Sequence, residues 1–112
     1  MLEDAPYAGW AALDRDAVRA RWIEACLAVA GSHEQAGRPE RALEWYQRAL
    51  SRDATLEDAH RGAMRSYAGL GHRDLAQRQY DRCVRILREE LDAAPDAETV
   101  ALREAIALPE VP

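Results

Sequence analysis

Three residue types are missing from the 112-residue sequence: it contains no lysine, no asparagine and no phenylalanine, and all 15 of its basic residues are arginine. We interpret this bias as the codon usage of a GC-rich genome. Alanine is abundant by contrast, and alanine and arginine are both strong helix formers. The composition therefore favours an all-α fold, and a chain of this length is expected to form one domain.

Long apolar runs are also missing. No stretch approaches the roughly 20 apolar residues that span a bilayer, and the chain does not open with a signal-peptide pattern. Its two cysteines, Cys26 and Cys83, lie far apart without a CxxC spacing. We therefore expect both thiols to be reduced and buried, as in a cytoplasmic protein.

Acidic residues outnumber basic ones, 20 to 15. The net charge is −5 and the isoelectric point is near 5.2. Affinity for DNA rests largely on neutralising phosphates with a basic surface. We therefore expect no direct binding of nucleic acid by this chain.

Motifs for catalysis and metal binding are missing as well. His33, His60 and His72 share no HxxxH spacing, and no cysteine lies at a metal-type spacing from them. The sequence also lacks a GxSxG, Walker or paired-carboxylate arrangement. We expect no catalytic residue, no cofactor site and no metal site, and we predict that the protein is not an enzyme.

What the sequence does contain is an internal repeat. The stretch GRPERALEWYQRAL, residues 37–50, returns as GHRDLAQRQYDRCV, residues 71–84, at an interval of 34 residues. Two helices with a glycine between them at this period are typical of a tetratricopeptide-like repeat. The residues that recur in register are Gly37 and Gly71, Ala42 and Ala76, Tyr46 and Tyr80, and the small pair Ala49 and Cys83.

Each recurring residue has a packing role. Ala42 and Ala76 let two antiparallel helices approach closely, and Tyr46 and Tyr80 fill the wider gap toward the next helix pair. The pattern predicts an all-α, tetratricopeptide-like superhelix of antiparallel helix pairs, with about five helices and no sheet. Within the single domain 1–112 we expect repeat units over about 23–56 and 57–90, and a C-terminal capping helix over about 96–108.

The N-terminal segment, residues 1–12, is predicted to be irregular because Pro6 and Gly9 discourage a helix. A long helix is expected from about Asp14 to Ala36. Its helical spacing of apolar residues predicts one face packed against the rest of the domain.

Turn and capping residues mark the later boundaries. Gly37 supplies a left-handed helix end, and Pro39 opens the second helix. Thr55, followed three residues later by Asp58, resembles a capping box at the start of the third helix. Asp96 is expected to cap the last helix.

Three longer stretches carry a more specific likeness. They are YAGWAALDRDAVRARW at residues 7–22, EDAHRGAMRSYAGLGHRDLAQRQYDRCVRILREEL at 57–91 and PDAET at 95–99. Together they resemble the bacterial transcriptional activator domain of SARP-type regulators, over nearly the whole chain. The resemblance implies a cytoplasmic regulator in which this helical domain follows a winged-helix DNA-binding domain. It implies a regulatory role through self-association, contact with other domains or modulation of transcription activation.

Two departures from the family pattern bear on this resemblance. The winged-helix segment and the helices that usually precede the YAGWA element are absent, so we expect the chain to be a fragment of a longer regulator. The family turn ELGV reads ELDA at residues 90–93, which predicts a less sharply defined exit from the fourth helix.

The repeat register places a candidate interaction surface on the concave face, which the first helix of each pair lines. Arg61 and Arg65 are one helical turn apart, so their guanidinium groups can point the same way and hold a carboxylate or phosphate. The alternative is a solvated face in which acidic residues balance the two arginines. The face comprises Glu24, Leu27, Gly31 and Glu34 from one pair and Asp58, Arg61, Arg65 and Ala68 from the other.

Tyr7 and Trp10 complete the candidate surface. Without the family's preceding helices, the N-terminal end of the repeat stack has no obvious cover, and an uncovered apolar patch favours association. The partner would be a second copy or another domain of the regulator. The alternative is that residues 1–12 fold back and shield the first helix.

We predict from these features a non-enzymatic regulatory and protein-interaction domain of a bacterial transcription activator, with DNA binding in a separate winged-helix domain. The alternative is a free-standing tetratricopeptide-like scaffold or adaptor that captures peptide ends. The carboxylate clamp of such adaptors is built on lysine and asparagine, and this chain has neither.

Overall fold

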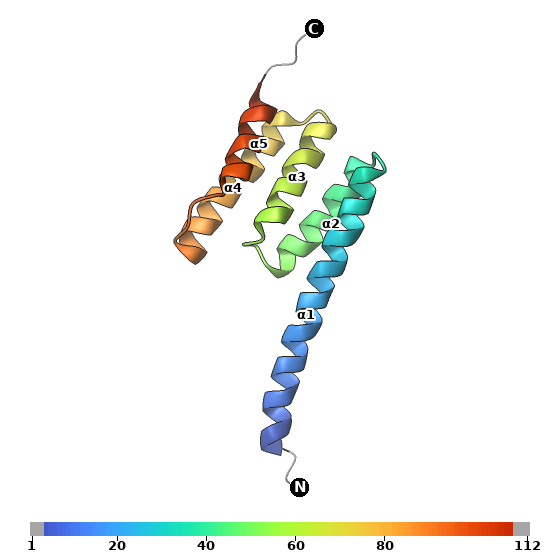
Figure 1. The fold of residues 1–112 in the computed structure, drawn as a ribbon, viewed down its shortest axis with the longest axis vertical. Coiled ribbons are helices and arrows are strands. Elements are labelled where there is room, and N and C mark those ends of the chain that lie inside the picture. The colour runs from blue at the N-terminus through green and yellow to red at the C-terminus, as the bar shows by residue number, and fades with distance from the viewer. Residues whose placement is uncertain (1–3, 109–112) are drawn as a thin grey trace.

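The computed structural model describes the backbone of residues 4–108 and the side chains of residues 14–108. Within these residues the chain is helical and has no strand, which confirms the predicted all-α fold (Figure 1). The helices are α1 (Asp4–Gln35), α2 (Pro39–Arg52), α3 (Glu57–Gly69), α4 (Arg73–Leu91) and α5 (Ala97–Ala107).

Each of the first four helices packs on the next one along the chain, so α1 pairs with α2 and α3 pairs with α4. The capping helix α5 packs on both α3 and α4, and Figure 1 shows it lying along α4. The helix α1 is much longer than its partner, and its N-terminal half extends beyond the other helices. The molecule is therefore elongated, with extents of 72 × 33 × 18 Å.

The glycines of the repeat end their helices as predicted. Gly37 and Gly71 have φ angles of 74° and 83°, in the left-handed region that other residues rarely adopt. Pro39 is the first residue of α2, where its missing N–H removes no intrahelical hydrogen bond. In both helix pairs, a glycine in the left-handed conformation thus ends the first helix.

The prediction of an irregular N-terminal segment was wrong for the residues that the structure describes, because α1 already begins at Asp4. Pro6 stands in the first helical turn, where backbone N–H groups have no intrahelical acceptor, so it does not interrupt the helix. Gly9 lowers helix stability by only about 1 kcal/mol. The helix of 32 residues is consequently about 48 Å long.

The predicted capping box at Thr55 was also wrong. The residue before α3 is Leu56, and no side chain caps that helix. Thr55 instead donates from its backbone N–H and its hydroxyl to Asp53 Oδ1, at 3.0 and 2.6 Å. These two bonds close the turn after α2, and Leu56 rather than Thr55 takes the capping position of α3.

The exit from α4 is more sharply defined than the ELDA sequence suggested. Asp92 takes a left-handed conformation with a φ of 50°, and its N–H donates to the carbonyl of Arg88. Aspartate tolerates this conformation better than most residues, so it replaces the glycine of the family turn. The following helix begins after Asp96, the predicted cap position, although its side chain makes no capping hydrogen bond.

The core confirms the roles assigned to the repeated small residues. Ala42, Ala49, Ala76 and Cys83 are all fully buried. Such small side chains let the axes of neighbouring helices approach closely, and any larger side chain would overpack the crossing.

Tyr46 fills the gap between the two helix pairs, and it does so against a glycine that the sequence analysis did not identify. A Cβ atom added to Gly62 of α3 would overlap the Tyr46 ring. In the second repeat Tyr80 lies under the guanidinium of Arg103 in α5, 5.5 Å from the ring centre. Both tyrosines thus contact the next element along the stack.

We expect Gly62→Ala to lower the free energy of unfolding by about 1–3 kcal/mol, because the methyl group forces the Tyr46 ring out of its place. Urea denaturation measures the change. The matched control is Gly31→Ala in α1, where an added Cβ meets nothing within 4 Å. The control should gain about 0.5–1 kcal/mol from helix propensity. Equal effects of the two substitutions would contradict the close contact.

Candidate interaction surface

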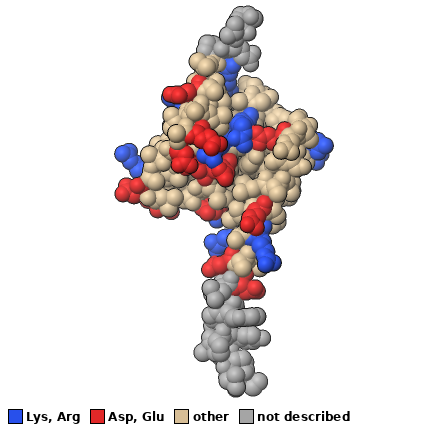
Figure 2. All heavy atoms as spheres, in the orientation of Figure 1, with Lys and Arg blue, Asp and Glu red and all other residues tan. Residues whose placement is uncertain are grey.

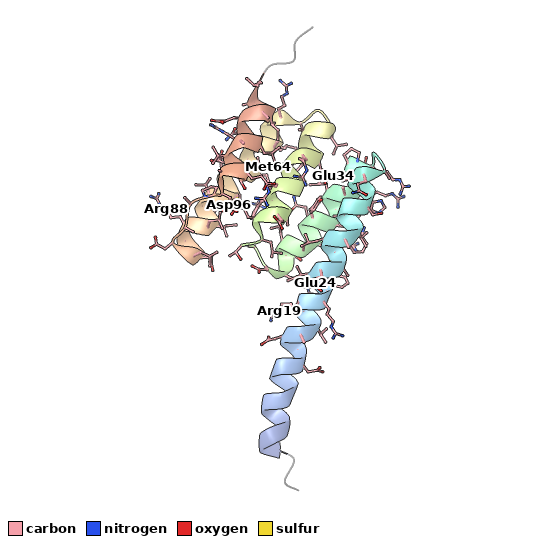
Figure 3. All side chains as sticks on the ribbon, viewed as in Figure 1. Arg19, Glu24, Glu34, Met64, Arg88 and Asp96 are labelled. Atoms are coloured by element: carbon pink, nitrogen blue, oxygen red, sulfur yellow. The ribbon has the colours of Figure 1, made fainter. Side chains whose placement is uncertain are left out.

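The residues predicted to form the concave face lie on α1 and α3, which contact each other. Glu24 is exposed and Leu27 is half-buried. Figure 3 shows Glu34 near the C-terminal end of α1 and Glu24 well before it along the helix. Glu24 therefore lies apart from the charged groups of α3, whereas Glu34 reaches them.

Glu34 joins three helices. Its carboxylate accepts from Arg65 of α3 at 2.5 Å (Nε to Oε2) and 3.2 Å (Nη2 to Oε1), and from the Tyr46 hydroxyl of α2 at 2.7 Å. Burial alone would raise the pKa of Glu34, but the hydrogen bonds from Arg65 and Tyr46 outweigh it and the pKa is lowered. Burial, together with the Glu34 carboxylate, raises the pKa of Tyr46 to about 12. The cluster is thus ionised at Glu34 and Arg65 and neutral at Tyr46 at ordinary pH.

Arg61 joins α3 to α5. Its side chain is nearly buried, with an ion pair to Asp58, and its Nε lies 3.5 Å from an oxygen of Glu98. Its Nη1 donates to the buried Thr99 hydroxyl at 2.8 Å and lies 3.8 Å from Glu57 Oε2. Three carboxylates therefore compensate the charge of this buried guanidinium. A buried charge needs such a partner because it has lost its contact with water.

Glu57 completes this cluster. Its Oε2 accepts from the Thr99 hydroxyl at 2.5 Å and from the backbone N–H of Asp96 at 2.6 Å. Asp96 is labelled in Figure 3 at the start of α5. One glutamate thus fixes both the entry and the first turn of the capping helix, 39 and 42 residues away in the chain.

The two guanidinium groups therefore do not act as a pair. Arg65 binds a carboxylate of α1, whereas Arg61 binds carboxylates of α3 and α5. On the face seen in Figure 2, acidic side chains gather around basic ones. This arrangement favours the acid-balanced face over a site for a carboxylate or phosphate ligand.

A buried polar cluster around His60 was not identified from the sequence. The ring Nε2 donates to the carbonyl of Ala54 at 2.7 Å, and the Gln79 amide donates to Nδ1 at 2.7 Å. Gln79 in turn accepts from Gln47 at 3.4 Å. Burial lowers the pKa of His60, and the nearby charge of Arg82 lowers it further, so the imidazole is held neutral. The only sequence signal was the position of His60 within the stretch 57–91 that carries the family resemblance.

The N-terminal half of α1 is a second candidate surface. The side chains of residues 14–21 are all exposed. Val18 and Trp22, one turn apart, are 60% and 40% exposed, although the Trp22 ring also lies 6.5 Å from that of Trp45. The side chains of Tyr7 and Trp10 lie outside the described residues.

Charged groups surround the exposed apolar residues of α1. Arg15, Arg19 and Arg52 line an open hollow together with Val18 and Trp22. Since Arg52 is the last residue of α2, that helix ends beside this part of α1. We call Arg15, Val18, Arg19 and Trp22 the free α1 face.

The part of the chain that the structure describes offers no metal-binding cluster, activated thiol or membrane-spanning helix. No group of three or more histidine, cysteine, aspartate or glutamate side chains there is placed to hold a metal ion. Burial raises the pKa of the Cys83 thiol to about 11 and also raises that of Cys26, so neither free thiol is an activated nucleophile. None of the described helices has the length and apolar character needed to cross a bilayer.

We expect Arg61→Met to lower the free energy of unfolding by about 2 kcal/mol, because Glu57 loses its countercharge and Thr99 a hydrogen-bond donor. Urea denaturation measures the loss, and faster amide hydrogen exchange in α5 would locate it. The matched control is Arg21→Met on the exposed side of α1, which should change stability by less than about 0.5 kcal/mol. Equal losses for the two variants would show that Arg61 does not hold α5.

The neutral His60 predicts a pH dependence. Its folded-state pKa lies below the ordinary 6.5, so the unfolded state takes up the proton first as the pH falls. The stability that the neutral His60 ring contributes is fully present above pH 6.5. It is lost as the pH falls from 6.5 toward the lower pKa of the folded state. We expect stability to fall between about pH 6.5 and 5, and His60→Gln to flatten this slope.

Urea midpoints measured from pH 7.5 down to about pH 5 test this. The lower limit avoids protonation of Glu34, whose ordinary pKa is 4.5 and whose contribution is lost only at lower pH. The control is His72→Gln, which changes an exposed histidine between α3 and α4. A slope that persists in His60→Gln and disappears in His72→Gln would contradict the assignment.

One comparison with known proteins agrees with the resemblance. The sequence model of the bacterial transcriptional activator domain matches residues 1–107. Searches of curated proteins and of solved structures returned no match. The match covers all five helices, including the long α1 and the capping α5. The chain therefore belongs to the bacterial transcriptional activator domain family.

Proposed function

We propose that this chain is a non-enzymatic protein-interaction domain of a bacterial transcription activator, acting in the cytoplasm. We further propose that it contacts another domain of the regulator, or a second copy of itself, through the free α1 face. The single observation that carries this proposal is the exposure of Val18 and Trp22 on the part of α1 where α2 ends.

The length mismatch between α1 and α2 supports an intermolecular or interdomain contact. α1 has 32 residues and α2 has 14, so α2 covers less than half of its partner. A helix in water gains most of its stability from tertiary packing rather than from intrinsic propensity. A partner that covers Val18 and Trp22 would supply that packing for the N-terminal half of α1.

DNA reading is assigned to a separate winged-helix domain. This chain carries a net charge of −5, and the cluster around Arg61 and Arg65 contains more carboxylates than guanidinium groups. Phosphate contacts position a protein on DNA before bases are read, and they need free basic side chains. The charge of this domain opposes that role.

The alternative of a peptide-capturing scaffold has no comparable support. Arg61 and Arg65, the two concave-face cations that would bind a peptide carboxylate, are engaged by carboxylates of this chain. A peptide end would have to displace them. We therefore retain the interaction domain of an activator as the function.

We expect the double variant Val18→Ser/Trp22→Ser to fold but to lose its partner contact. Light scattering across a range of concentrations measures self-association. A transcription reporter driven by a regulator that carries this domain measures contact with other domains. The double variant should lower the apparent mass, the reporter activity or both.

The matched control is Leu91→Ser/Leu108→Ser, which removes two exposed leucines at the C-terminal ends of α4 and α5, 56% and 66% exposed. It should leave mass and reporter activity unchanged. Unaltered mass and reporter activity in the Val18/Trp22 variant would refute the proposed contact. Sequence-specific retention of duplex DNA by the isolated chain at physiological salt would refute the assignment of DNA binding to a separate domain.

A further inference from the structure

A second hollow lies between α2 and α4, remote in sequence from the free α1 face. Its volume is about 440 Å³, and it is lined by Leu50 and Ser51 of α2, by Arg82, Arg85 and Ile86 of α4, and by the edge of the His60 cluster. Pockets that take small organic molecules have volumes of about 300–1,000 Å³. The volume of the hollow therefore falls within the range of small-molecule sites.

The rim of this hollow is cationic. Arg82 and Arg85 are three residues apart on α4, so both side chains lie on the same side of the helix. Both are exposed, and no carboxylate of the described residues forms an ion pair with either. Arg61 and Arg65 of α3, by contrast, are each neutralised by carboxylates of this chain.

The positive charge extends into the hollow. The guanidinium of Arg82 lies close enough to the buried His60 ring to help lower its pKa. Both ring nitrogens of His60 are already hydrogen-bonded, so the ring adds no free acceptor there. The local potential thus favours an anion in an otherwise acidic protein.

The hollow also has an apolar part. Leu50 is buried, with 8% of its surface exposed, and Ile86, which also lines the hollow, is half-buried. The Ser51 hydroxyl donates its one hydrogen to the carbonyl of Arg48, so the charged contacts of the hollow come from the two arginines. An apolar wall beside two unpaired guanidinium groups is the combination that binds an amphiphilic acid, because guanidinium forms paired hydrogen bonds with carboxylate and phosphate.

We propose that the hollow between α2 and α4 binds a small organic anion. Its carboxylate or phosphate group lies between Arg82 and Arg85, and its apolar body lies against Leu50 and Ile86. The site takes one helix from each pair, so a bound ligand bridges the two repeats. This site is independent of the interaction assigned to α1.

The test uses the intact chain and four probes: phenyl phosphate, benzoate, inorganic phosphate and the neutral benzyl alcohol. Titrations followed by 1H–15N NMR should show saturable shifts at Ile86 and at the side-chain amide of Gln47, which also lines the hollow. We expect phenyl phosphate and benzoate to bind with dissociation constants on the order of 1 mM or below. Inorganic phosphate should bind more weakly and benzyl alcohol not measurably.

Arg82→Gln and Arg85→Gln should each weaken phenyl phosphate binding by about fivefold or more, since each removes one charge-assisted contact. The matched control is Arg21→Gln, which removes the same charge from exposed α1 and should leave binding unchanged. Equal binding by phenyl phosphate and inorganic phosphate would overturn the apolar part of the site. Shifts centred on residues 15–22, or undiminished binding in both α4 variants, would overturn the site itself.

Discussion

The contact between Tyr46 and Gly62 sets the spacing between the two helix pairs. The Tyr46 ring lies directly on the α3 backbone, where no side chain other than hydrogen fits. Its hydroxyl donates to Glu34 of α1, and Glu34 also holds Arg65 of α3. One side chain of α2 thus connects three helices, and it limits how closely the two helix pairs approach.

Charge compensation extends this scaffold to the capping helix. Arg61 stands one turn before Arg65 on α3 but faces α5, where it meets Thr99 and Glu98. Glu57 binds the backbone and the first turn of the same helix. Because Arg61, Thr99 and Glu57 are largely withdrawn from water, they hold α5 through hydrogen bonds and ion pairs. The charged face of α3 therefore chiefly stabilises the packing of α1 and α5 on α3.

Two other surfaces remain available for function, and they differ in chemistry. The free α1 face offers Val18 and Trp22 on a projecting helix and suits a partner helix or domain. The hollow between α2 and α4 offers Arg82 and Arg85 beside an apolar wall and suits a small anion. Together the two proposals give the regulator one surface for a partner and another for a ligand. The Tyr46 ring lies between the two helix pairs that carry these surfaces.

Sequence patterns alone determined the helical class, the 34-residue period, the left-handed turns at Gly37 and Gly71, and the family resemblance. These features depend on local backbone preferences and on the spacing of small residues, and both can be recognised directly in the sequence. The N-terminal start of α1 was misjudged because Pro6 breaks a helix only outside its first turn.

The partners of Arg61 and Arg65 were decided only by the tertiary structure. Glu34 and Arg65 are 31 residues apart, and Arg61 and Thr99 are 38 apart. The helical register shows which way a guanidinium points but not which carboxylate of another helix reaches it. The same holds for the neutral His60 and for Gly62 under Tyr46, because burial and close approach are properties of the packed helices.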